Sequence, residues 1–155
     1  MASVFTTLQN QVVERLAELP FFGEAPAIPV LAENRRDILS ELRANLGKLG
    51  VCVVIGTPQA RQTTPSKHSP PHFSRITVVC EIFENVILNR AASGSGQPGS
   101  LVAEAVAYYL TGWAPAILGN ALLIEGIDPI EHQQYAVHEV SLFTGGAIAE
   151  PTRQI

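Results

Sequence analysis

The stretch from Arg75 to Arg90, RITVVCEIFENVILNR, constrains the fold of this chain most, because its apolar residues alternate with polar ones. Apolar side chains at every second position are typical of a β-strand that packs one face on a core. The apolar positions are Ile76, Val78, Cys80, Ile82, Val86 and Leu88. The partly polar second face favours an antiparallel or mixed sheet over a parallel strand buried on both faces. Since strands usually have roughly three to ten residues, we expect a bend or bulge near Glu84 and Asn85.

The composition predicts one domain that contacts other protein surfaces. A chain of 155 residues is most simply a single domain. Hydrophobic residues make up 46% of it and charged residues 15%, whereas about 25% charged residues is ordinary for a soluble domain. Some of this apolar surface is therefore expected to meet a partner subunit. The net charge of -4 argues against sequence-specific nucleic-acid binding, although it allows a local basic patch.

Location and redox state follow from two simpler features. The N-terminal residues lack the basic and apolar segments of a secretory signal, and no run approaches the length of a membrane span. We therefore expect a cytoplasmic protein with no membrane contact. Cys52 and Cys80 lie in apolar runs, which predicts two reduced, buried thiols. A disulfide is possible only if their strands are neighbours.

The order of elements predicts an α+β domain over residues 1–145, followed by a flexible tail over 146–155. We expect a mostly antiparallel or mixed sheet, about three helices packed on it, and a long hairpin or arm. The expected elements are a helix over 3–19, an edge strand over 27–32, a helix capped by Asn34, a central strand over 51–55, the long strand, a helix over 101–113 that Ser100 caps, and strands over 121–125 and 134–144, with a turn over 126–129.

Two segments without apolar periodicity interrupt these elements. Residues 57–72 contain four prolines and form a predicted arm, in which Arg61 and Lys67, with Arg75 just beyond, face no acidic residue. Such a segment is either a functional contact element or a solvated tip without a partner, and both interpretations stay open. Residues 91–100 form a glycine-rich loop.

The glycine-rich loop contains Gly94-Ser95-Gly96-Gln97-Pro98-Gly99, which matches the G-x-G-x-x-G pattern of dinucleotide sites. Such a site brings the backbone up to a pyrophosphate at a helix N-terminus. The preceding strand is long and half polar, Pro98 removes an amide donor from the turn, and repeated βαβ units are missing. A flexible connector explains the glycines more simply, and a nucleotide or small-molecule site is kept as the alternative.

No other group of residues predicts catalysis or metal binding. His68 and His72 stand four apart, but Pro70 and Pro71 between them exclude the helix that would aim both at one metal. Glu81 and Glu84 point to opposite faces of a strand, so they cannot share a site unless a bulge intervenes. We therefore predict a protein that is not an enzyme and needs no cofactor.

The distribution of charge suggests self-assembly. The basic arm with Arg61, Lys67 and Arg75 contrasts with residues 121–150, which are acidic and carry no Lys or Arg. The acidic residues of most interest are Glu125, Asp128 and Glu131. Opposite patches on one domain allow a head-to-tail contact between copies, which closes into a ring when the rotation permits. Two unrelated solvated faces are the alternative interpretation.

The order of elements, together with Glu84-Asn85, Leu88-Asn89-Arg90 and Leu110-Thr111-Gly112-Trp113-Ala114-Pro115, resembles the tail terminator or tail-completion proteins of long-tailed phages and Mu-like prophages. The similarity spans most of residues 4–144. It implies a structural protein, commonly a hexameric ring, that assembles at the end of the tail tube and joins it to the head-side connector. It also implies a location in the bacterial cytoplasm and then in the virion tail. A regulatory module that binds another protein as a monomer is a further alternative.

Overall fold

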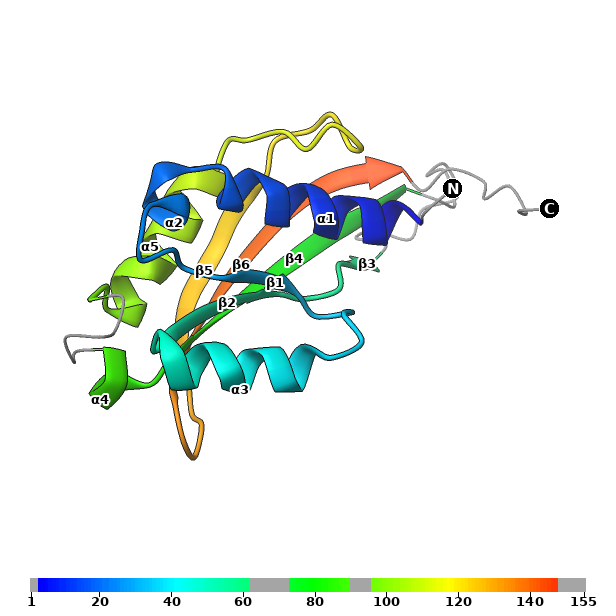
Figure 1. Cartoon of the computed structure of the whole chain (residues 1–155). Coiled ribbons are helices and arrows are strands. Elements are labelled where there is room, and N and C mark those ends of the chain that lie inside the picture. Colours follow the sequence, from blue (N-terminus) through cyan, green and yellow to red (C-terminus); the bar gives the residue numbers. More distant parts are fainter. Residues whose placement is uncertain (1–2, 62–72, 90–95, 148–155) are drawn as a thin grey trace.

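The structure, a computed structural model, describes residues 3–61, 73–89 and 96–147. Its elements are α1 (Val4–Ala17), α2 (Pro20–Gly23), β1 (Val30–Ala32), α3 (Ile38–Lys48), β2 (Val51–Ile55), β3 (Gln59–Arg61), β4 (Phe73–Glu84), α4 (Val86–Asn89), α5 (Gly99–Leu110), β5 (Leu123–Ile130) and β6 (Ala136–Ala147). Figure 1 shows helices grouped around one long, twisted sheet, with the start of α1 and the end of β6 on the same side of the molecule.

A mixed sheet of six strands organises the chain. The strand order is β1-β2-β4-β6-β5, and β3 pairs with the N-terminal part of β4. β1 runs parallel to β2, whereas all other pairs of strands are antiparallel. β4 and β6 pair along their whole lengths, from Phe73 opposite Ala147 to Glu84 opposite Ala136. The predicted α+β class with a mixed sheet, and the predicted pairing of the last strand with the long strand, are confirmed.

The main core lies between one face of the sheet and the helices α1 and α5. The predicted period of two is confirmed along β4, and the predicted helical stripe is confirmed along α1. The fully buried residues of these two elements are Ile76, Val78, Cys80 and Ile82 on β4, and Leu8, Val12 and Leu16 on α1. Burying each aliphatic side chain stabilises the fold by about 1.5–3 kcal/mol, so this layer fixes the position of both helices.

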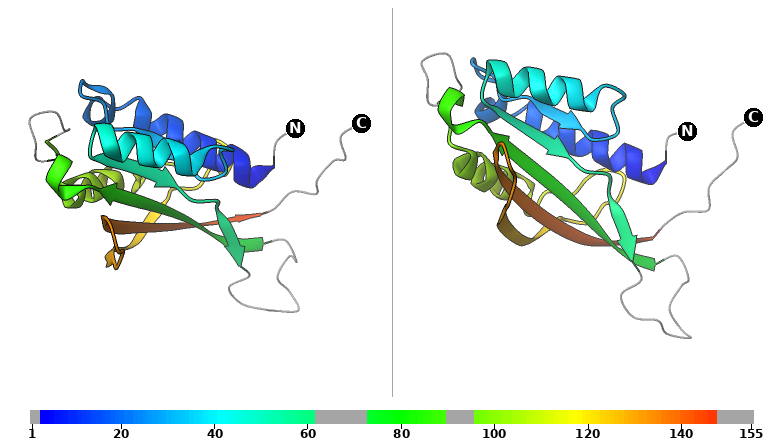
Figure 2. Two further views of the ribbon diagram at one scale, coloured as in Figure 1. Left: turned by 60° about the horizontal axis from the view of Figure 1, so that its bottom comes forward. Right: turned by 90° about the horizontal axis from the view of Figure 1, so that it is seen from below.

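The opposite face of the sheet is covered only in part. α3 packs there on β1 and β2, where Leu46 belongs to one buried cluster with Leu31, Cys52 and Val54. Figure 2 shows α3 on the side of β1 and β2, with β5 and β6 farther away. Apart from Phe83, which packs on the α3 cluster, the residues of β4, β6 and β5 on this face have no major contact with a described helix, and many of them stay partly or largely exposed.

The long strand ends at Glu84 and does not continue to Arg90 as predicted. Residues 86–89 form the one-turn helix α4, so Val86 does not extend the buried face of the strand. The side chain of Asn85 accepts a hydrogen bond from the backbone N–H of Leu88 (3.3 Å). An Asn side chain that bonds to nearby backbone competes with strand geometry. The irregularity expected near Glu84 and Asn85 is therefore the end of the strand.

Two helices begin at other residues than predicted. α3 begins at Ile38 with Asp37 at its N-cap, so Asn34 does not cap it. α5 begins at Gly99, which places the predicted cap Ser100 inside the helix. Neither helix has a side-chain hydrogen bond at its N-cap. Residue type alone therefore misplaced both starts, because the packing of the helix on the sheet decides where the chain turns.

Two predicted loops contain strands. Within the predicted arm over 57–72, residues 59–61 form β3, and residues 62–72 lie outside the described part of the chain. Residues 126–129, predicted as a turn, lie inside β5, which pairs with β6 up to Ile130. A shift of register between Ile124 and Gly126 absorbs the irregular sequence as a β-bulge. The tertiary pairing with β6 thus overrides the local turn signal of Gly126 and Pro129.

Candidate assembly surface

β5 is the most exposed strand of the sheet. It pairs with β6 on one side, and its other edge has no strand partner among the described residues. Four of its aliphatic side chains keep 39–50% of their surface exposed, namely Leu123, Ile124, Ile127 and Ile130. An eight-residue edge strand with unpaired backbone groups and exposed aliphatic residues offers a surface on which a partner can pack.

The part of this sheet face that no described helix covers adjoins this edge. The strand registers place on it Thr77, Val79 and Glu81 of β4, Glu139, Ser141 and Phe143 of β6, and Leu123, Asp128 and Ile130 of β5. All of these residues are partly or largely exposed. We call this face, together with the outer edge of β5, the assembly surface. Its mixture of aliphatic, aromatic and acidic groups is suited to a protein partner.

Three carboxylates follow one another across the assembly surface. Glu81 lies opposite Glu139 in the β4–β6 register, and Glu139 lies opposite Asp128 in the β6–β5 register. Burial raises the pKa of Glu81, repulsion from Glu139 and Glu33 raises it further, and His132 partly offsets these effects. Like charges directly opposite each other destabilise a sheet. Within residues 3–61, 73–89 and 96–147, no group of three His, Cys, Asp or Glu residues could hold a metal ion.

The structure locates five of the six residues predicted to contact a neighbouring subunit. Arg75 and Glu125 form an ion pair of 2.8 Å within one chain, and Arg75 also lies 4.1 Å above the ring centre of Phe143. Two of the six are therefore already paired with each other. Asp128 and Glu131 are exposed on β5 and just after it, and no ion pair between described residues includes either. Arg61 is exposed on β3, which pairs with β4 and is not a neighbour of β5 in the sheet. Lys67 lies outside the described residues.

The glycine-rich segment offers no open anion site where the structure describes it. Positions 94 and 95 lie outside the described residues, and Gly99 begins α5. A Cβ added at Gly99 would lie 3.1 Å from Oε1 of the buried Glu84 carboxylate. The other carboxylate oxygen accepts a hydrogen bond of 2.7 Å from the Asn89 side chain, which also donates to the Gln97 carbonyl (2.6 Å). A phosphate at this helix N-terminus would face a carboxylate, which disfavours the nucleotide alternative.

Successive side chains of a strand point to opposite faces of the sheet, and this separates two pairs of reactive side chains, the two thiols and the carboxylates of Glu81 and Glu84. β2 and β4 are neighbours, but Cys52 faces α3 whereas Cys80 lies in the main core, and both thiols are free. Burial is the main cause that raises the pKa of each thiol to about 12. Glu81 is half-buried on one face and Glu84 is buried on the other, as predicted from their spacing.

Two of the four histidines, His132 and His138, lie in the described part of the chain, and the buried Nδ1 atom of His138 has no hydrogen-bond partner there. His68 and His72 lie outside it. The Nδ1 atom of His132 accepts hydrogen bonds from the backbone N–H groups of Gln134 and Tyr135, and the ring stacks on that of Tyr135. This histidine therefore shapes the turn between β5 and β6.

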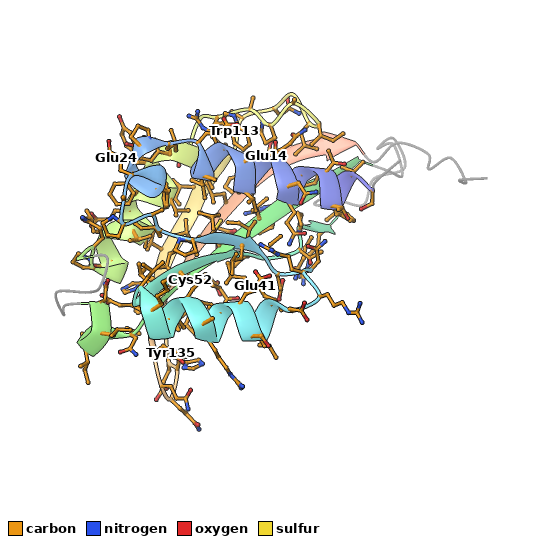
Figure 3. The ribbon with its side chains drawn as sticks, viewed as in Figure 1. Glu14, Glu24, Glu41, Cys52, Trp113 and Tyr135 are labelled. Carbon is orange, nitrogen blue, oxygen red and sulfur yellow. The ribbon has the colours of Figure 1, made fainter. Side chains whose placement is uncertain are left out.

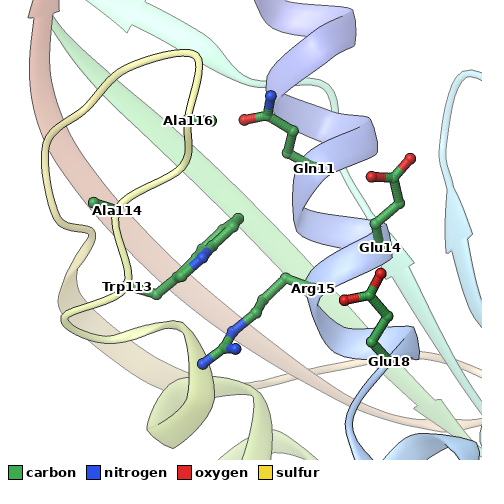
Figure 4. Close-up of a pocket in the computed structure, with 7 residues that line it drawn as sticks. All are labelled: Gln11, Glu14, Arg15, Glu18, Trp113, Ala114 and Ala116. Carbon is green, nitrogen blue, oxygen red and sulfur yellow. The ribbon is translucent and has the colours of Figure 1, made fainter.

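A groove lies between α1 and the segment that follows α5. Arg15 points from α1 towards Trp113, and its guanidinium carbon lies 5.9 Å from the centre of the indole ring (Figure 4). Two hollows of about 380 and 440 Å³ share Arg15 and Trp113, and Tyr108 and Tyr109 line the second. Backbone hydrogen bonds from Gly112 to Leu122 (2.8 Å) and from Leu122 to Trp113 (2.9 Å) fix the Trp113 wall. We call this feature the Arg15 groove.

The comparisons with known proteins bear on the fold. No family model matches the chain, and no curated protein matches it. A solved structure of a protein without a functional name is similar to it, with a TM-score of 0.53 and 14% sequence identity. The similarity covers 95% of this chain and 97% of that one. At this identity, the likeness supports the α+β fold alone.

Sequence reasoning missed both surface features. The aliphatic residues of β5 were hidden because Gly126 and Pro129 indicated a turn, although apolar residues continue on both sides of them. The Arg15 groove brings together residues about 100 positions apart, and only the packing of α1 against α5 shows it. The one usable signal was a Trp at the end of the predicted helix, since Trp is enriched in binding surfaces.

Proposed function

We propose that this protein is a non-enzymatic structural subunit of a phage or prophage tail, which assembles as a ring at the tail end and joins the tail tube to the head-side connector. The resemblance of the sequence to tail terminator proteins is the reason for proposing a phage tail as the assembly to which the subunit belongs. The exposed, aliphatic edge strand β5 beside an uncovered sheet face is the observation that carries self-assembly. Such an edge is a liability for a free monomer and is useful to a subunit that buries it.

The charge of the surface supports the same function. The assembly surface carries Glu81, Glu139 and Asp128 in one row, so a wrong contact with an acidic surface is repelled. An obligate ring interface buries roughly 2,000 Å² or more, and in this proposal the edge of β5 and the adjoining sheet face supply that interface. No helix in the described part of the chain is long and apolar enough to cross a membrane.

The test is the mass of the purified protein in solution, measured by light scattering over a series of protein and salt concentrations. We expect a ring-sized oligomer, and electron micrographs of it should show closed rings. The variant Leu123→Lys places a charge on the assembly surface and should shift the mass to that of the monomer. The matched control is Leu39→Lys, which replaces another exposed leucine, on α3 (67% exposed, against 50% for Leu123), and should leave the oligomer intact. A monomer at every concentration, or equal effects of the two variants, would contradict self-assembly through β5.

A further inference from the structure

The Arg15 groove holds a cation that forms no ion pair with another described residue. Ion pairs between described residues join Arg35 with Glu41 and Arg75 with Glu125, and neither includes Arg15. Its Nε atom is buried and has no hydrogen-bond partner among the described residues. The guanidinium lies instead beside Trp113, an arrangement that keeps its outer N–H groups free for a carboxylate.

Aromatic residues make the rest of the groove suitable for a protein segment. Tyr108 is 77% exposed, and its ring packs edge-to-face on that of Tyr109 with 5.2 Å between ring centres. Trp, Tyr and Arg are the residue types that contribute most of the binding energy at protein interfaces. Aromatic walls also favour proline, whose ring packs flat on them, as in grooves that bind Pro-rich peptides.

The acidic residues near the groove lie to one side of it. Glu14 and Glu18 line the first hollow together with Trp113, and in Figure 4 they extend from α1 farther from the indole ring than Arg15 does. The second hollow, which Arg15 shares with Tyr108 and Tyr109, has no carboxylate among its lining residues. An incoming carboxylate therefore meets the guanidinium in the second hollow without direct repulsion there.

The same chain presents a segment that matches this groove. Asp128-Pro129-Ile130-Glu131 at the end of β5 combines two exposed carboxylates with an exposed proline and an exposed isoleucine. No ion pair between described residues involves either acid. The segment leads into the turn between β5 and β6, which projects from the molecule in Figure 1. In Figure 3, Tyr135 of this turn and Trp113 of the groove lie at opposite ends of the molecule, so the two features cannot meet within one chain.

We infer that the Arg15 groove of one copy receives the Asp128–Glu131 segment of a second copy. This inference rests on the proposed ring and names the contact that propagates it. A contact between two different surfaces at opposite ends of a subunit is heterologous, and repetition of it closes a ring when the rotation permits. Arg15 thereby takes the place that the sequence analysis gave to Arg61 and Lys67 of the arm.

Charge reversal tests the contact between copies. Arg15→Glu and Glu131→Arg should each weaken assembly at least about 10-fold, because each places like charges together. The double variant should recover most of the loss, since the pair is restored with opposite polarity. Arg43→Glu, an exposed charge reversal on α3, should have no effect. Sedimentation velocity gives the dissociation constants. Equal assembly of wild type and Arg15→Glu, or failure of the double variant to recover while both single variants remain folded, would overturn the inference.

A peptide experiment separates this inference from the proposed function. Trp113 is the single tryptophan of the chain, so its fluorescence reports the groove directly. A peptide with the sequence of residues 125–132 should change this fluorescence in the wild-type protein but not in Arg15→Glu. A version in which Asp128 and Glu131 are replaced by Asn and Gln should bind more weakly. Binding by a protein that stays monomeric would sustain the groove and contradict the ring. An oligomer whose groove ignores the peptide would sustain assembly and overturn the groove contact.

Discussion

Replacement of Gly50 by alanine should be among the most destabilising single changes in the described chain. Gly50 joins α3 to β2 with a φ angle of +83°, and a Cβ there would lie 2.6 Å from the backbone N and Cα atoms of Asn89. The left-handed conformation costs an alanine about 1–2 kcal/mol. The steric overlap adds to this cost, because it pushes α4 away from the end of α3.

The displacement of α4 also affects a buried hydrogen-bond network. The Asn89 side chain donates to Glu84 and to the Gln97 carbonyl, and loss of such buried bonds costs about 1–3 kcal/mol each. We therefore expect Gly50→Ala to lower the free energy of unfolding by about 3 kcal/mol or more, within a total of roughly 5–15 kcal/mol. For a domain of this size, that loss corresponds to a drop in Tm of roughly 6–12 °C.

Two other glycines serve as controls in urea or thermal unfolding. Gly112 has a φ angle of +84° but nothing within 4 Å of an added Cβ, so Gly112→Ala should cost only the conformational part, about 1–2 kcal/mol. Gly47 lies in α3 with open space around it, so Gly47→Ala should stabilise the protein by about 0.5–1 kcal/mol. If Gly50→Ala proves no more destabilising than Gly112→Ala, the steric argument at Asn89 is refuted.

Three further predictions use the charges and thiols. The pKa of Glu81 is raised in the folded state, so ionisation of this carboxyl lowers the stability of the fold as the pH rises through that pKa. In unfolding curves, Glu81→Gln should therefore stabilise the protein by less than about 1 kcal/mol at pH 7 and should give no gain at pH 3. Cys52 and Cys80, with pKa values raised to about 12, should resist alkylation at pH 8 until urea unfolds the protein; fast labelling would contradict their burial. Arg75→Ala removes a partly exposed ion pair and a ring contact, so it should cost about 1 kcal/mol, and a loss above about 3 kcal/mol would contradict that view.

The sequence predicted the scaffold well where a pattern was long and regular. Three regular apolar patterns correctly predicted buried residues, because apolar side chains in a regular pattern are stabilised by burial. They are the period of two over residues 76–82, the stripe of Leu8, Val12 and Leu16, and the apolar run of β2. Prediction failed at the ends of elements. At Asn34 and Gly126, the local signal competed with pairing or packing partners that lie far away in the sequence. At Asn85, a local hydrogen bond from the Leu88 N–H ended the strand that the apolar alternation had extended.

The candidate site was less predictable than the fold. The acidity around Glu125, Asp128 and Glu131 was visible in the sequence, but its partner was assigned to the arm because charge runs are the only signal that a sequence offers. The structure pairs Arg75 with Glu125 inside one chain and leaves Arg15 unpaired beside Trp113. Neither outcome follows from spacing, since the paired residues are 50 positions apart.

The sequence by itself determined the α+β class and which faces of β4 and α1 are buried, because hydrophobic periodicity acts over neighbouring residues and needs no knowledge of the rest of the chain. Only the tertiary structure decided that, within the described chain, part of one sheet face stays uncovered, that β5 is an exposed edge, and that Arg15 faces an aromatic groove. These features depend on strand order and on how helices pack on the sheet. Both are set by the total burial of the whole chain, which no local pattern encodes.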